Sequence, residues 1–267
     1  MKFFRLLIVC ICFLGTGMPT VKAQANRFLQ PVQFNDLHTV YSYQKSNWDG
    51  THSSTIFLYI RDTNMLESFK WSKGDDWATL VSANVDWANF SIRRFENHRI
   101  YKDGKRNLFA ELEVTEPRKL FFHVADIRDS MILDDEHWQS YDFDFAGLGF
   151  SWRALKDKSG SFSFLIADAG MKDNKPVFEN KGRVQVDYIG KEFVNGKQCL
   201  KYKIDGHGLQ NKGGYIWINP DNYMIELYRI ALPDEDGFVN GQLKLLKTEK
   251  LSPAEWEKFI NEKMAMK

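Results

Sequence analysis

The chain has 267 residues, of which 36 are Lys or Arg, 35 are Asp or Glu and 15% are aromatic. This near-neutral balance excludes a basic face for nucleic acid and an excess of cations for anionic lipid. The length is enough to bury one large core or two modest ones.

The N-terminal residues have the three parts of a secretory signal peptide. Lys2 and Arg5 precede an apolar run of roughly 10 residues, and the small side chains of Val21 and Ala23 occupy the −3 and −1 positions of a cleavage site. The run is shorter than the roughly 20 residues that a membrane-spanning helix needs. We expect cleavage after Ala23 and export of a bacterial protein to the periplasm or the exterior; a retained membrane anchor is the alternative.

Cleavage would change the charge and the thiol content of the chain. Removing three cations would leave 33 basic against 35 acidic residues, a net charge of −2. Of the three cysteines only Cys199 would remain, so no disulfide could form within the mature chain. An exported protein of this kind must be stabilised by its core. No second apolar run of spanning length follows, and we expect no membrane span in the mature chain.

Short segments in which apolar and polar residues alternate recur along the rest of the sequence, as in antiparallel β proteins. They predict strands at 56–60, 81–87, 108–114, 120–124, 141–145, 162–167, 184–188, 200–204, 215–218, 224–230 and 242–246. The pairs Asp103-Gly104 and Asn195-Gly196 tolerate the positive φ of tight turns and predict hairpins. No connection has the length and regularity of a crossover helix, which makes a parallel sheet unexpected.

One helix is predicted, at the C-terminus. Ser252-Pro253-Ala254-Glu255 forms a capping box with proline at the first helical position, and Trp256, Phe259 and Ile260 fall on one face. We expect this face to pack against the sheet or over an open barrel end. The predicted fold is mainly β, a curved antiparallel sheet or incomplete β-barrel with a C-terminal helix. Residues 24–267 are expected to form a single domain, with a subdivision near 168–181 as the alternative.

Two acidic clusters were weighed as chemical sites. Asp134-Asp135-Glu136-His137 combines carboxylates with an imidazole, but contiguous side chains of a strand or turn point apart and do not converge on one ion. Asp142 and Asp144 lie on one face of a predicted strand, about 7 Å apart, not far from the spacing of paired glycosidase acids. Both clusters are more typical of solvated structure, and we predict no catalytic residue.

The remaining chemical signatures are missing from the sequence. The six histidines are scattered without the spacing of a metal motif. Cys199 alternates with apolar neighbours, which favours packing over nucleophilic chemistry. No nucleophile elbow or phosphate-binding glycine loop is present. We therefore predict no metal and no cofactor.

The positive signal is aromatic. Tryptophans on curved sheets line hollows for apolar ligands, form platforms for sugar rings, or fill a β core. Trp48 and Trp77 fall in predicted loops, where a ring has less reason to be buried. Strand position suggests Trp152 and Trp217 as ligand-binding residues, with Trp87 and Phe122 as further pocket wall.

The segment from Tyr188 to Pro220 resembles a known family. Its Asn195-Gly196 turn, its strand Cys199-Leu200-Lys201-Tyr202 and its Gly214-Tyr215-Ile216-Trp217-Ile218-Asn219-Pro220 run look like the C-terminal half of exported bacterial proteins with sheets similar to the lipoprotein carriers LolA and LolB. The resemblance implies an incomplete antiparallel barrel with a helix against its concave face, and further a lipid-like ligand.

Three functional hypotheses follow. The first is a non-enzymatic envelope protein that binds an apolar or amphipathic small molecule in a β-sheet hollow. The second is a structural or assembly role with a protein partner in the envelope. The third is a carbohydrate-binding or carbohydrate-cleaving protein that uses exposed tryptophans and the acids near Asp135 and Asp142.

Overall fold

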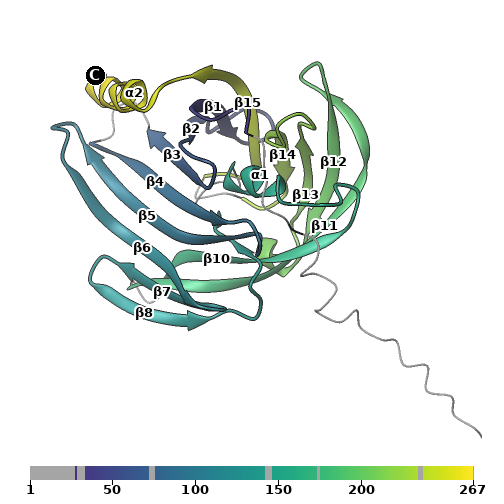
Figure 1. Cartoon of the computed structure of the whole chain (residues 1–267), viewed down its shortest axis with the longest axis horizontal. Helices are drawn as coiled ribbons and strands as arrows, with labels where there is room; N and C mark the ends of the chain where they lie inside the picture. The colour runs from purple at the N-terminus through teal and green to yellow at the C-terminus, as the bar shows by residue number, and fades with distance from the viewer. Residues whose placement is uncertain are drawn as a thin grey trace, which may run out of the picture.

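The computed structural model describes residue 28 and the ranges 34–71, 76–141, 146–172, 175–233 and 237–266. These residues form one sheet of fifteen strands that curves around an inner face (Figure 1). The strand order is β8-β7-β6-β5-β4-β3-β2-β1-β15-β14-β13-β12-β11-β10-β9, so the sheet has two edges and does not close. The predicted mainly β, curved and incomplete barrel is confirmed. The predicted signal peptide lies outside the described residues.

Two meanders make up the sheet and are joined in its middle. The first contains β1 (Thr39–Ser46), β2 (Ser54–Ile60), β3 (Met65–Trp71), β4 (Trp77–Asp86), β5 (Ser91–Tyr101), β6 (Arg106–Glu116), β7 (Lys119–Val124) and β8 (Ile127–Ile132). The second contains β9 (Trp138–Gln139), β10 (Phe162–Lys172), β11 (Lys175–Val194), β12 (Lys197–Asp205), β13 (Gly214–Ile218), β14 (Ile225–Ile230) and β15 (Gly241–Lys250). Strand β1 pairs with β15 and thereby connects them.

All strand pairs are antiparallel except the short β9–β10 contact, which is parallel. The predicted Asn195-Gly196 turn joins β11 to β12, and both residues have positive φ, 52° and 77°. That conformation is the one that two-residue hairpins need, because it matches the twist of the strands. Within the segment 168–181, considered as a boundary, residues 168–172 and 175–181 belong to β10 and β11, which pair with each other in the same sheet.

The inner face of the sheet carries the main core. Side chains from both meanders, such as Leu58, Phe95, Leu112, Ile166 and Ile216, form one continuous buried apolar cluster. Within this concavity lies α1 (Ala146–Trp152), a short helix that sequence reasoning missed.

Helix α1 sits directly on the strands. A Cβ added at Gly149 would lie 3.0 Å from the backbone nitrogen of Ile225 on β14, so the close approach requires glycine. The predicted strand at 141–145 is wrong in its first residue, because Tyr141 belongs to a helical turn; residues 142–145 lie outside the described ranges.

The outer face of the first meander is covered by the C-terminal helix α2 (Pro253–Ala265). Trp256 is fully buried, stacks on Tyr59 with a ring-centroid distance of 4.9 Å, and donates from its indole nitrogen to Glu67 at 2.6 Å. The predicted capping box of Ser252 and Glu255 is present. The expected packing of the C-terminal helix against the sheet is confirmed. Successive strand residues alternate between faces, so α2 lies on the outer face, and the helix inside the concavity is α1.

Candidate functional site

The inner face is covered by α1 together with a strap from the N-terminal part of the chain, which we define as Phe28 and residues 34–38. Phe28 pairs with Leu155 through a backbone bridge, and its ring lies 5.0 Å from that of Phe90 and 4.8 Å from that of His137. Phe90 in turn contacts Phe162 at 5.1 Å. The aromatic side chains of the inner face therefore pack closely against one another and against the strap.

A buried ion pair fastens the strap to the chain just after α1. Both guanidinium nitrogens of Arg153 donate to Asp36, at 3.0 and 2.5 Å, and the two side chains are only 5% and 13% exposed. The hydroxyl of Tyr41 donates to the same carboxylate at 2.5 Å and accepts from the amide of Asn222 at 3.0 Å. Burial, followed by the charge of Asp36, raises the pKa of Tyr41 well above its usual range, so this phenol stays protonated.

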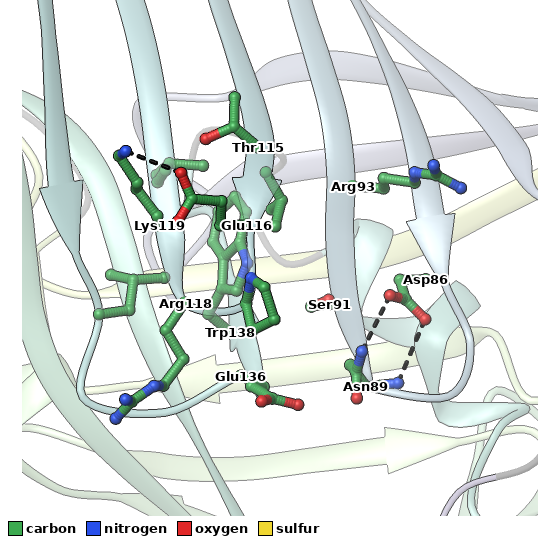
Figure 2. Close-up of a pocket in the computed structure, with 14 residues that line it drawn as sticks. Asp86, Asn89, Ser91, Arg93, Thr115, Glu116, Arg118, Lys119, Glu136 and Trp138 are labelled. Carbon is green, nitrogen blue, oxygen red and sulfur yellow. Dashed lines mark hydrogen bonds and ion pairs between the residues drawn. The ribbon is translucent and has the colours of Figure 1, made fainter.

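A hollow of about 290 Å³ opens where the inner face meets solvent, and we call it the rim hollow. Its walls come from the β4–β5 turn, the β6–β7 turn and the segment between β8 and β9 (Figure 2). It is lined by Asp86, Asn89, Ser91, Arg93, Val114, Thr115, Glu116, Pro117, Arg118, Lys119, Leu120, Leu133, Glu136 and Trp138.

The lining of the rim hollow is divided between apolar and charged side chains. Leu120, Leu133 and Trp138 are buried members of the inner core, and they supply the apolar part. In Figure 2 the ring of Trp138 lies between Arg93 on one side and the pair formed by Lys119 and Glu116 on the other. The hollow is therefore amphipathic.

Local structure explains how the charged groups are held. The ammonium group of Lys119 donates to Glu116 at 2.9 Å across the β6–β7 turn. Asp86 accepts from the backbone nitrogens of Ala88 and Asn89 and so fixes the β4–β5 turn. Arg93 is the extra residue of a bulge between β4 and β5, and bulges re-aim side chains at sheet ends. Its guanidinium group is exposed, as are the side chains of Arg118 and Glu136.

A second hollow, of about 430 Å³, lies beyond Arg93. Its lining is almost wholly polar: Asn64, Met65, Ser82, Asn84, Arg93, Arg94, Glu96 and Glu113. Arg94 is paired with Glu96 at 2.8 Å and Glu111 at 2.7 Å. Because it lacks the apolar floor of the rim hollow, this outer hollow serves below as a comparison site.

The four ligand-binding residues proposed from the sequence do not meet in one hollow. Trp87, Phe122 and Trp152 are buried in the inner core, and Trp152 ends α1 instead of lying on a strand. Trp217 lies on the other face of the sheet, in a small cluster with Cys199 and Leu227.

The acidic cluster 134–137 diverges, as the sequence predicted. Asp134 accepts from Asn180, Asp135 pairs with Arg183 at 2.7 Å, and the buried ring of His137 contacts the carbonyl oxygen of Asn89. Asp142 and Asp144 lie outside the described residues. Within the described part of the chain no three His, Cys, Asp or Glu side chains are grouped as a metal site.

Other residues singled out in the sequence behave as packing or surface groups. Cys199 is a buried free thiol, and burial raises its pKa to about 11. Trp48 lies in a turn, as predicted, whereas Trp77 is the first residue of β4 and not part of a loop; the two side chains are 44% and 40% exposed. The indole nitrogen of Trp48 donates to the carbonyl of Gly241, and Arg99 lies over the ring of Trp77 at 4.6 Å.

Sequence reasoning missed the side chains that line the rim hollow. Arg93, Arg118 and Lys119 belong to no motif, and Trp138 was grouped with the other tryptophans without a role. They come together only because the ends of the β5, β6 and β9 strands meet in space. The one local signal is Pro117, which marks the β6–β7 turn.

No protein-family profile matches the chain, and no curated protein matches its sequence. Among solved structures it is similar to the Mycobacterium tuberculosis lipoprotein LppX, with 14% identity over 81% of this chain and 88% of that one and a TM-score of 0.22. It is also similar to a putative outer membrane lipoprotein-sorting protein domain from Vibrio parahaemolyticus, with 10% identity over 84% and 90% of the two chains and a TM-score of 0.22. At TM-scores this low neither similarity assigns a family.

None of the helices in the described ranges combines the length and the apolar character that crossing a membrane requires.

Proposed function

We propose that this protein is a non-enzymatic binding protein for an amphipathic, lipid-like small molecule, and that it acts after export to the cell envelope. In this proposal the apolar part of the ligand lies against Leu120, Leu133 and Trp138 at the rim of the inner face. Its polar part lies among the exposed side chains of Arg93 and Arg118.

The observation that supports this proposal is the divided lining of the rim hollow. Ligand sites are mostly apolar, with a few placed polar groups that fix orientation. The rim hollow combines inner-core side chains with charges of both signs, whereas the residues that line the outer hollow are polar or charged except for Met65, and none of them is an aromatic ring or a leucine of the inner core. A volume of about 290 Å³ is at the low end of ligand sites, which range from roughly 300 to 1,000 Å³. The rim hollow is therefore large enough for one part of a lipid-like ligand and not for the whole molecule.

In this proposal the rest of the molecule reaches the inner face when the cover formed by the strap and α1 shifts. They cover the inner face with one seven-residue helix and a length of irregular chain, not with a second sheet. A shift of this cover would extend the rim hollow along a continuous apolar surface. The proposed place of action rests on the predicted signal peptide.

Binding of a dansyl-labelled undecanoic acid, followed by probe fluorescence, tests the proposal. Thr115 is exposed on β6 and lines the rim hollow, so Thr115→Trp places a ring in that space with little strain on the fold. Ser82→Trp makes the same change in the outer hollow and is the matched control. We expect Thr115→Trp to weaken probe binding about tenfold, the loss of one well-packed apolar contact, and Ser82→Trp to leave it unchanged. Equal binding by both variants, or none by the parent chain, would overturn the proposal.

A further inference from the structure

The β11–β12 hairpin extends beyond the strands on both of its sides. Strand β10 pairs with β11 only as far as Val186, and β13 pairs with β12 only from Leu200 onward. Residues 187–199 therefore form a two-stranded arm, which ends in the Asn195-Gly196 turn. Because a strand rises about 3.3 Å per residue, the several residues of the arm that lack an outer neighbour project past the body of the sheet. Figure 1 shows the arm standing out from the neighbouring strands.

The arm carries apolar side chains that no other part of the described chain covers. Phe193, next to the turn, is 72% exposed, and Ile189, at a bulge nearer the sheet, is 51% exposed. Phe57 and Phe69 on the outer face of the first meander are by contrast covered by α2.

Charged and amphipathic side chains surround these two residues. Lys191 is exposed at the tip; Lys197 pairs with the buried carboxylate of Glu226 at 2.5 Å. Near the base of the arm, Lys201 pairs with Glu192 at 2.6 Å. Lys197 and Lys201 are therefore neutralised by their partners, and Lys191 is the one cation of the described arm without a salt bridge.

Behind the tip lies an aromatic pair on the neighbouring strand β13. The rings of Tyr215 and Trp217 are 6.0 Å apart, and the ammonium group of Lys201 lies over them at 4.5 and 5.1 Å. Tyr215 is 41% exposed. Trp217 is only 6% exposed and packs with Cys199 and Val194, so this pair lies on the face opposite Phe193 and holds the base of the arm against the sheet.

We propose that the arm is a membrane-contact element, and that Phe193 inserts into the interface of a phospholipid bilayer with Lys191 beside the headgroups. The size of the arm favours a bilayer over a protein partner. A stable protein interface buries about 800 Å² on each side, more than a narrow two-stranded tip offers, whereas a bilayer accepts one or two inserted side chains. This proposal does not depend on the rim hollow.

Because only one cation at the tip is free of a salt bridge, insertion of the ring is the main contribution. Binding should occur on vesicles of phosphatidylcholine alone and increase only about two- to fivefold when half of the lipid is phosphatidylglycerol, as one lysine near an anionic surface allows. This local contact is compatible with the near-neutral charge of the whole chain.

Co-sedimentation of the full chain with these two kinds of vesicle tests the proposal. Phe193→Ser should lower the partition coefficient about tenfold, the loss expected for one inserted aromatic side chain. Ile132→Ser is the matched control, because Ile132 on the edge strand β8 is 74% exposed but lies away from the arm. Equal losses in the two variants, or no sedimentation of the parent chain with either vesicle, would overturn the proposal, and so would binding by the arm to a protein but not to lipid.

A second readout does not depend on affinity. An environment-sensitive dye attached to Phe193→Cys in the cleaved chain 24–267 should shift to the blue with vesicles, whereas the same dye on Ile132→Cys should not; this chain lacks Cys10 and Cys12 and its remaining thiol, Cys199, is buried, which leaves labelling selective. Thr115→Trp should sediment with vesicles like the parent chain, so a failure of the rim-hollow proposal and a failure of the arm proposal give different results.

Discussion

The ion pair between Arg153 and Asp36 offers a quantitative test of how the strap is held. Replacement of Arg153 by leucine would leave the carboxylate of Asp36, which is only 13% exposed, without its charge partner. Breaking a buried pair in this way costs roughly 3–5 kcal/mol. The hydroxyl of Tyr41 still donates to the same carboxylate, so we expect the lower end of that range, about 3 kcal/mol.

A double-mutant cycle separates the pair from its surroundings. Asp36→Leu leaves the buried guanidinium group of Arg153 without a charge partner, and should lower the free energy of unfolding about as much as Arg153→Leu does. The double variant should lose little more stability than either single variant. The coupling energy between the two residues is then about 3 kcal/mol. The measurement is the free energy of unfolding from urea titrations followed by fluorescence.

The control for this cycle is an exposed ion pair. Arg94 is 51% exposed and pairs with Glu96 and Glu111, so Arg94→Leu should cost less than about 1 kcal/mol. If Arg153→Leu costs no more than Arg94→Leu, or if the two single changes at the strap simply add, then the ion pair does not fasten the strap.

Three further predictions concern the outer face and the C-terminal helix. Trp256→Ala should destabilise the fold by about 3–5 kcal/mol, seen as a lower melting temperature, because a fully buried ring and its hydrogen bond to Glu67 are lost; a change under about 1 kcal/mol would show that α2 is not part of the stable fold. The Cys199 thiol, with its pKa raised to about 11, should react slowly with a thiol reagent at pH 8 and faster as the pH approaches 11, whereas rapid reaction of the folded chain at pH 8 would contradict its burial. Ser252→Ala should cost about 1 kcal/mol. Because hydrogen bonds from Ser252 lower the pKa of Glu255, the part of the effect that comes from the carboxylate is present above the unfolded pKa and is lost as the pH falls through the folded one. The difference between variant and parent should therefore narrow in acid, while the part from the Ser252 hydroxyl that accepts the Glu255 N–H remains.

Features that depend on a few adjacent residues could be predicted from the sequence. The Asn195-Gly196 turn and the capping box of Ser252 are set by backbone conformation and local hydrogen bonds, so their residues identify them directly. Several strands with one buried face were also found, such as β6 and β7, because alternation reports one-sided burial. Strands β3, β5 and β8 were not predicted.

Strands that are covered on both faces were harder to predict. In β1 the side chain of Val40 contacts the outer cluster under α2, while Tyr41 and Tyr43 face the inner core, so the alternation disappears. Helix α1 was missed because its sequence contains Gly147 and Gly149, which weaken helix propensity. Its conformation is stabilised by tertiary packing within the concavity.

The candidate site was the least predictable part. The rim hollow brings Arg93, Arg118 and Trp138 together from three separate segments, and their proximity depends on the twist and curvature of the whole sheet. Trp217 was chosen by its position in a strand, but it lies on the opposite face of the sheet from Trp87 and Trp152. The face that a distant strand presents depends on its register, which the local sequence pattern does not encode.

Mapping of the ligand contact by photo-cross-linking tests the central claim most directly. A fatty acid with a photoreactive diazirine in its acyl chain would be bound to the full protein, irradiated, and the modified peptides identified by mass spectrometry. Binding at the rim hollow predicts adducts within residues 114–120 and 133–138, which contain its apolar floor, and their loss in Thr115→Trp. Adducts confined to α2 or to the outer face around Trp217, or the same adducts in Thr115→Trp as in the parent chain, would contradict it.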